Sequence, residues 1–275
     1  MKKSRKKGSF EDVGLATWPP SVCNMLSGNT NPLVAINFVA PPNPLTGKVH
    51  YPRRMGFMIE RFDNGLRLVA TCRHSIQYFR MPLYRKMIAF KNPRPTMLVC
   101  VGDPIEDPVA ENDVAFFVVR DPSNTPTKPF TVLPDDLPIV DGKVLYSAQN
   151  FCDPIKSYYS VGPVSQAVSD PRLIFCKLSM AATEHALPDD HGRRQQLKQD
   201  GWLEYLLLQM VSRPGFSGSP IWDDQLQFYG MDIRGSTPKD SFYKKTGDVA
   251  VCLPSSNLYA ARQRVQDQVR RLTKA

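Results

Sequence analysis

The sequence predicts an all-β protein of two barrels followed by a C-terminal helix. Short apolar runs rich in β-branched residues recur along the 275 residues, separated by Pro, Gly, Asn and Asp, as in strands joined by turns. The 25 prolines disfavour long helices over most of the length. Only the C-terminal segment carries apolar residues at helical spacing.

The first half of the chain offers five candidate strands. They are Leu33–Ala40, Met55–Arg61, Leu66–Thr71, Met97–Val101 and Val114–Arg120. Turn sequences such as Asp63-Asn64-Gly65 separate them, as in a meander or a Greek-key barrel. We expect this first barrel over residues 31–125, preceded by a basic N-terminal extension over residues 1–30.

The second half repeats this pattern after a linker. The prolines between Asp121 and Asp141 are too frequent for a central strand, so residues 126–145 are predicted to join two domains. Further candidate strands are Ser157–Val161, Leu173–Leu178, Leu203–Val211, Gln225–Ile233 and Asp248–Leu253. We expect them to form a second barrel over residues 146–254.

A single helix is predicted over residues 255–275. It would begin after a cap at Ser255 or Ser256. One face of this helix is apolar and consists of Leu258, Ala261, Val265, Val269 and Leu272. We expect that face to dock on the second barrel.

The composition is that of an ordinary globular protein, with 42% hydrophobic and 22% charged residues. No apolar run reaches the ~20 residues of a membrane-spanning helix. The basic start of the chain lacks the apolar segment of a signal peptide. The six cysteines stand singly, without a Cys-x-x-Cys pair. We therefore expect reduced thiols, a cytoplasmic location and no membrane partner.

The net charge of +9 favours anionic partners. Much of the excess is local, because basic residues cluster between Lys2 and Lys7 and again between Arg262 and Lys274. A solvated basic tail is favoured over a dedicated phosphate-binding arm. Nucleic acid is therefore a disfavoured partner.

The segment Arg213–Pro220 has the character of a tight turn that exposes a serine. Ser217 lies between Gly215 and Gly218, directly after an apolar run. Gly215 can adopt backbone angles that aim its N–H, together with that of Ser217, at a developing oxyanion. An ordinary turn between two strands fits this segment equally well when it is taken alone.

A nucleophilic serine needs a general base, and the ordinary pKa of histidine suits that task. The histidines are His50, His74, His185 and His191. All precede Ser217, which disfavours an α/β-hydrolase, whose histidine follows the serine. His74 ends a strand-like segment, whereas the others lie in loops. A loop metal site is a disfavoured alternative. Its ligands would be Glu184, His185, Asp190 and His191.

The third group of such a site must be a carboxylate that accepts the second N–H of the imidazole. Asp113 stands immediately before the apolar strand 114–120, which would carry it to the edge of the core. Asp103 and Asp107 compete for this role, but both precede prolines in a loop. A surface acid at the start of a strand is the simpler interpretation of Asp113 taken alone.

Three segments resemble chymotrypsin-like serine proteases. Leu68–His74 resembles the strand and turn that end at the catalytic histidine of that family. Asn112–Phe116 resembles its Asn-Asp-Ile-Ala-Leu element, and Gly215–Pro220 resembles its Gly-Asp-Ser-Gly-Gly-Pro turn. The order His, Asp, Ser suits a histidine and an acid on the first barrel and a serine on the second.

The resemblance implies two antiparallel barrels of six strands each. It implies a catalytic triad of His74, Asp113 and Ser217, with the N–H groups of Gly215 and Ser217 as the oxyanion hole. Phe216 replaces the aspartate that pairs with a new N-terminus in zymogen-activated members. Cys72 precedes the histidine, whereas secreted members have a cysteine after it. Both departures indicate an intracellular bacterial or viral type.

The resemblance also implies where substrate binds. The residues are Val211, Ser212, Asp232, Ile233, Arg234 and Gly235. Val211 and Ser212 would line the primary specificity pocket, and the strand from Ile233 to Gly235 would be an edge that pairs with the substrate backbone. Asp232 would either favour a basic side chain in that pocket or face solvent or a neighbouring strand, and the second is preferred.

The sequence therefore predicts a serine endopeptidase that cleaves a polypeptide substrate through an acyl-enzyme, with no cofactor and no metal. The alternative is an inactive binding module of the same fold that contacts an acidic protein or nucleic acid. A third possibility is a latent enzyme that a regulatory protein partner activates. Retention of all three side chains of the triad favours an enzyme.

Overall fold

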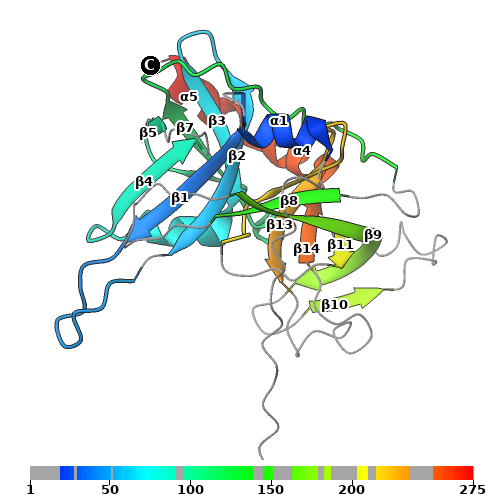
Figure 1. Cartoon of the computed structure of the whole chain (residues 1–275), viewed down its shortest axis with the longest axis horizontal. Helices are drawn as coiled ribbons and strands as arrows, with labels where there is room; N and C mark the ends of the chain where they lie inside the picture. The colour runs from blue at the N-terminus through cyan, green and yellow to red at the C-terminus, as the bar shows by residue number, and fades with distance from the viewer. Residues whose placement is uncertain are drawn as a thin grey trace, which may run out of the picture.

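The computed structural model describes residues 19–27, 30–50, 52–90, 96–138, 145–150, 163–178, 183–186, 203–209, 215–235 and 250–274. Two antiparallel β-sheets make up most of this part of the chain, and three α-helices accompany them (Figure 1). The mostly β class predicted from the sequence is confirmed. None of the helices in the described ranges is long and apolar enough to cross a membrane.

The first sheet closes into a six-stranded barrel. Its strands are β1 (Leu33–Val39), β2 (Arg53–Arg61), β3 (Leu66–Cys72), β4 (Arg85–Phe90), β5 (Thr96–Cys100) and β7 (Val114–Arg120). They follow the order β3-β2-β1-β4-β5-β7, and pairing of β3 with β7 closes the ring. The short β6 (Ile105–Glu106) adds to β7. Strand β4 was not predicted, because its two leading charges shorten the apolar run.

The second sheet holds seven strands. They are β8 (Leu145–Asn150), β9 (Pro163–Leu178), β10 (Thr183–Ala186), β11 (Leu203–Gln209), β12 (Pro220–Trp222), β13 (Phe228–Gly235) and β14 (Ala250–Pro254). Their order is β10-β9-β11-β14-β13-β12-β8. The predicted strand Ser157–Val161 lies outside the described residues, and β8, β10 and β12 were not predicted. A second barrel stays a prediction.

Helices occur at both ends of the described chain, so the expectation of helix only at the C-terminus is wrong. Helix α1 (Pro20–Ser27) begins at a proline, which suits the first helical position because no N–H is needed there. The predicted C-terminal helix is two helices, α4 (Ser255–Arg264) and α5 (Gln266–Lys274). They are separated at Val265, whose φ of −98° and ψ of 6° are not helical.

The two C-terminal helices dock on different sheets. Helix α4 contacts β13 and β14, as predicted, whereas α5 contacts β7 of the first barrel. Docking of the whole apolar face on the second half is therefore wrong for α5. The predicted serine cap is also wrong, because Asp136 caps this helix from the linker. Its carboxylate accepts the Ser256 N–H at 2.8 Å and the Ser256 hydroxyl at 2.8 Å.

One continuous apolar core joins the two sheets. It contains Phe57 of β2, Trp222 of β12, Phe228 of β13 and Leu258 of α4. Phe130 of the linker packs between them, with ring centroids 5.8 Å from both Phe57 and Trp222. Such aromatic pairs stabilise by about 0.5–1.5 kcal/mol each beyond their buried area. The core therefore fixes β3 of the first barrel relative to the turn before β12.

Candidate active site

Strand pairing brings His74 and Asp113 together. Strands β3 and β7 run antiparallel, and Cys72, the last residue of β3, lies opposite Val114, the first residue of β7. His74 follows β3 within the 3-10 helix η2 (Arg73–Tyr78), and Asp113 precedes β7 directly. The two side chains thus leave the same end of the barrel from neighbouring strands.

Asp113 binds His74 through both carboxylate oxygens. The distance from His74 Nδ1 to Asp113 Oδ2 is 2.6 Å, and the His74 backbone N–H donates to Oδ1 at 2.8 Å. The Asp113 carbonyl accepts the Arg73 N–H at 2.7 Å. With Nδ1–H donating to the carboxylate, neutral His74 has Nε2 available as a proton acceptor. The His74 side chain is 37% exposed.

The competing acids are placed elsewhere. Asp103 is exposed in the loop before β6. Asp107 is fully buried and forms a bidentate ion pair with Arg264 of α4. His50 lies in an exposed loop, with its ring 6.3 Å from that of Tyr78. Asp113 is therefore the acid that accompanies His74.

Ser217 lies in a tight turn that needs glycine on both sides. Gly215 has a φ of 107° and Gly218 a φ of 86°, values that side chains disfavour. A Cβ atom at Gly218 would lie 2.0 Å from the carbonyl oxygen of Met55 and 2.6 Å from Oγ1 of Thr71. The predicted turn therefore exists, and it sits against β2 and β3 of the first barrel.

Main-chain hydrogen bonds attach this turn to the barrel. The Met55 N–H donates to the Ser217 carbonyl at 2.9 Å, and the Gly218 N–H donates to the Asp232 carbonyl at 2.8 Å. The Cys72 thiol donates to the same Asp232 carbonyl at 3.3 Å. Cys72 is only two residues before His74, so the Ser217 turn and the histidine lie at the same end of β3.

Within the residues that the structure describes, the Ser217 hydroxyl and the His74 ring are not hydrogen-bonded. Catalytic hydrogen bonds are often long in unliganded sites and shorten when substrate binds. The structure thus brings all three residues to one region and joins two of them directly.

Cys72 is a further candidate nucleophile or metal ligand in this region. Its sulfur, a His74 ring nitrogen and an Asp113 oxygen lie within 4.8 Å of one another. Burial, and then the carboxylates of Asp113 and Asp232, raise the pKa of the Cys72 thiol well above its ordinary value. A protonated thiol is a poor nucleophile and a poor ligand, and Nδ1 of His74 is already hydrogen-bonded. The cluster suits a hydrogen-bond network better than a metal.

The predicted substrate residues are described only in part. Val211 and Ser212 lie outside the described residues. The preferred alternative for Asp232 was solvent or a neighbouring strand, and its 0% exposure excludes solvent and leaves the strand. Burial and the Asp232 carboxylate together raise the pKa of the Cys252 thiol well above its usual range. In the strand register, buried Asp232 lies opposite Cys252 of the neighbouring strand β14.

The segment from Ile233 to Gly235 is paired with a described strand on one side, as expected near the edge of a sheet. Up to Met231, β13 pairs with β12, and Ser219 accepts the Asp232 N–H. Beyond Asp232, β14 is the only described strand that pairs with β13. Ile233 is buried, whereas Arg234 and Gly235 are half-buried. Pairing with a substrate backbone stays a prediction.

Phe216 and Thr71 were not predicted to support the turn. Phe216 is 2% exposed and packs with Leu206, Ile221 and other residues of the second sheet, so an apolar side chain anchors the turn. Thr71 Oγ1 donates to the Met55 carbonyl at 2.6 Å, next to the amide that holds Ser217. The position of Thr71, three residues before His74, was the available signal for its role.

Comparison with known proteins places this architecture among protease folds. No protein-family model and no curated protein matches the sequence. The active form of the Rv3671c protease of M. tuberculosis matches with a TM-score of 0.53 and 13% identity, over 90% of this chain and 84% of that one. The inactive form of a mutant of Rv3671c matches with a TM-score of 0.51 and 11% identity, over 92% and 94%. Because the identities are this low, the similarity shows a shared fold and nothing more.

Proposed function

We propose that the chain is a serine endopeptidase in which Ser217 is the nucleophile, His74 the general base and Asp113 the acid that orients the histidine. The observation that carries this proposal is the 2.6 Å hydrogen bond between His74 Nδ1 and Asp113 Oδ2. It leaves Nε2 as the base, on the end of β3 to which the Ser217 turn is attached. The protease fold supports the same conclusion.

The reaction follows from these roles. Ser217 Oγ attacks the carbonyl carbon of the scissile bond while its proton passes to Nε2 of His74. The C–N bond then breaks, and the leaving amine takes that proton, which leaves an acyl-enzyme. Water repeats the sequence and restores the serine. The N–H groups of Gly215 and Ser217 would stabilise the oxyanion, a contribution of about 3–4 kcal/mol per donor in comparable sites.

The proposal extends to the parts that position substrate. A polypeptide would pair with the strand from Ile233 to Gly235, beside a pocket lined by Val211 and Ser212. A second six-stranded barrel is supported by the pairing of β12 with β8 and of β8 with β9, which links six strands in a ring. A reducing, cytoplasmic setting is supported by the free thiols of Cys72, Cys100 and Cys252.

A fluorophosphonate probe tests this function on the full-length chain. The unmodified protein should be labelled at Ser217, as located by mass spectrometry of the modified peptide. Ser217→Ala and His74→Ala should both abolish labelling, because one removes the nucleophile and the other its base. His50→Ala is the matched control, since His50 is exposed in a loop, and it should be labelled like the unmodified protein.

Two results would contradict the proposal. A folded protein that is not labelled would favour a latent enzyme or a binding module. Equal labelling of the His74→Ala variant would mean that the serine is not activated by this histidine.

A further inference from the structure

Two arginines of α4 bind carboxylates of the first barrel, and one of them reaches the loop that ends at Asp113. Arg264 Nε donates to Asp107 Oδ1 at 2.8 Å, and a terminal N–H of Arg264 donates to Oδ2 at 2.7 Å. The Asp107 side chain is 0% exposed. This is the parallel two-bond geometry in which a guanidinium fixes a carboxylate most firmly.

The Asp107 carboxylate in turn holds the loop from within. Asn112 Nδ2 donates to Oδ2 at 2.6 Å, and the Val109 N–H donates to Oδ1 at 3.3 Å. The Asp107 N–H donates to the Val114 carbonyl at 3.0 Å. The Asp107 side chain thus binds the middle of the loop and Asn112, and its main-chain N–H binds the first residue of β7.

Asp113 depends on this loop for its orientation. It has a φ of 52° and a ψ of 40°, a left-handed conformation that is uncommon for residues other than glycine. It immediately follows Asn112, which is bound to Asp107. The loop is also held from β11, where the Tyr205 hydroxyl donates to the Glu111 carbonyl at 2.8 Å. Such a conformation persists only where the surroundings hold it.

The charges of Asp107 and Arg264 stabilise each other. Burial raises the pKa of Asp107, but hydrogen bonds from Arg264, Asn112 and the Val109 amide outweigh it and hold that pKa below its ordinary value. The hydrogen bond to Asp107 raises the pKa of Arg264. Both groups therefore stay charged across the pH range in which a histidine acts as a base.

We propose that Arg264 is a positioning residue that makes the proposed active site depend on docking of the C-terminal helix α4. Through Asp107 and Asn112 it holds Asp113 in the orientation that binds His74. This inference rests on the proposed protease function, because the consequence for rate requires that His74 and Asp113 act together in catalysis.

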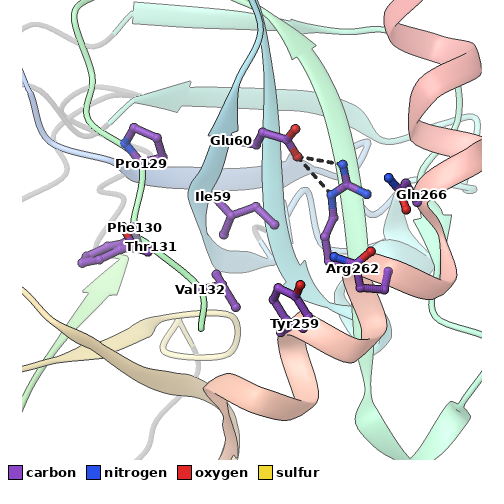
Figure 2. A pocket seen from close by; sticks show the side chains of 10 residues that line it. Ile59, Glu60, Pro129, Phe130, Thr131, Val132, Tyr259, Arg262 and Gln266 are labelled. Atoms are coloured by element: carbon purple, nitrogen blue, oxygen red, sulfur yellow. Dashed lines mark hydrogen bonds and ion pairs between the residues drawn. The ribbon is translucent and has the colours of Figure 1, made fainter. Parts of the chain in front are cut away.

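Arg262 is the matched control on the same helix. Its Nε and a terminal N–H donate to Glu60 Oε2 at 3.1 and 2.7 Å (Figure 2). Glu60 belongs to β2, and the pair borders a cavity of about 400 Å³ between β2, the linker and α4. None of the residues that line this cavity belongs to the Asp107–Asp113 loop. Both arginines thus join α4 to the first barrel, but only Arg264 contacts that loop.

The experiment compares Arg264→Met with Arg262→Met in the full-length protein. The first readout is the downfield proton resonance of His74 Nδ1–H, which reports the hydrogen bond to Asp113 without requiring activity. The second readout is the rate of fluorophosphonate labelling at Ser217. We expect Arg264→Met to lose or shift the resonance and to be labelled roughly 10- to 100-fold more slowly, the range for a misplaced catalytic group. Arg262→Met should resemble the unmodified protein in both.

A conservative pair keeps the test usable if Arg264→Met does not fold. Arg264→Lys retains the charge but loses the two-bond geometry, and it should fall between the unmodified protein and Arg264→Met. Arg262→Lys is its control. Equal resonances and equal rates in the Arg264 and Arg262 variants would overturn the inference. Loss of the resonance in the Arg264 variants alone, with no labelling of any protein, would support the positioning role and count against the protease.

Discussion

On the first barrel, His74 is bound by the Asp113 side chain, whereas Ser217, in the turn before β12 of the second sheet, is held through its main chain. The carboxylate of Asp113 accepts two N–H groups of His74 at 2.6 and 2.8 Å. Ser217 is fixed by the Met55 amide at 2.9 Å and by a turn whose glycines have positive φ. The proposed base is therefore oriented by a direct hydrogen bond, while the position of the proposed nucleophile depends on how the turn sits against the barrel.

Asp113→Asn should have the largest effect on activity and almost none on the turn. An amide cannot hold the histidine in the tautomer that leaves Nε2 as the acceptor, and the loss for such a change in a serine-protease triad is about 10⁴-fold in kcat. This corresponds to roughly 5.5 kcal/mol of transition-state stabilisation. The rate of fluorophosphonate labelling measures the loss, and urea unfolding should show little change in midpoint.

Asp103→Asn is the control for this prediction, because Asp103 is exposed in the loop before β6. It should be labelled at the rate of the unmodified protein. A similar loss in both variants would point to overall charge rather than to the bond with His74.

Gly218→Ala should displace the turn that carries Ser217, the other half of the candidate site. A methyl group there would lie 2.0 Å from the Met55 carbonyl oxygen, so the main chain must shift. We expect a destabilisation above about 4 kcal/mol, which is exceptional for one substitution, and loss of labelling. Urea unfolding followed by tryptophan fluorescence measures the first effect.

Gly65→Ala separates the clash from the cost of the backbone conformation. Gly65 has a φ of 80°, close to the 86° of Gly218, but a Cβ atom there meets nothing within 4 Å. This variant should lose only about 1–2 kcal/mol, the cost of a left-handed residue, and should be labelled normally. If both variants lose the same free energy of unfolding, contact of the turn with Met55 does not hold Ser217.

The sequence was most informative where a residue's role is set by its neighbours in the chain. Strand β7 was predicted residue for residue, because an apolar run is bounded by Asp113 and Asp121. The turn at Ser217 was predicted from its glycines. Helix α1 was not predicted because the many prolines disfavour long helices over most of the sequence, although Pro20 suits a first helical position.

Contacts between distant parts of the chain could not be predicted in the same way. Asp136 caps α4 from 120 residues away, and Arg264 binds Asp107 across 157 residues. No local pattern marks either partner, since an acid in a loop and an arginine on a helix are ordinary surface residues when taken alone. In the sequence, Asp107 is a loop acid beside a proline, and only the fold shows that it is buried.

The last prediction concerns acid, and it compares the charged Asp107–Arg264 pair at the first barrel with the uncharged contacts of the Ser217 turn. The pKa of Asp107 lies below its ordinary value in the folded protein, so its ion pair stabilises the fold fully above the unfolded pKa of about 3.9. That stabilisation is lost as the pH falls through the folded pKa. The Ser217 turn, held by amides and carbonyls, has no such dependence. Asp107→Asn should cost roughly 1.5–3 kcal/mol at pH 7, as for hydrogen bonds to a charged group.

The measurement is the free energy of unfolding in urea at pH 7, 5, 4 and 3. The difference between the unmodified protein and Asp107→Asn should be constant from pH 7 to pH 5 and should shrink below pH 4, because protonation removes in the first what the substitution removes in the second. Glu60→Gln, which removes the pair with Arg262, is the control. The Glu60 carboxylate is 39% exposed, so the loss at pH 7 should be at most about 1 kcal/mol. A difference for Asp107→Asn that persists unchanged at pH 3 would mean that the shape of the side chain, and not its charge, holds the loop that ends at Asp113.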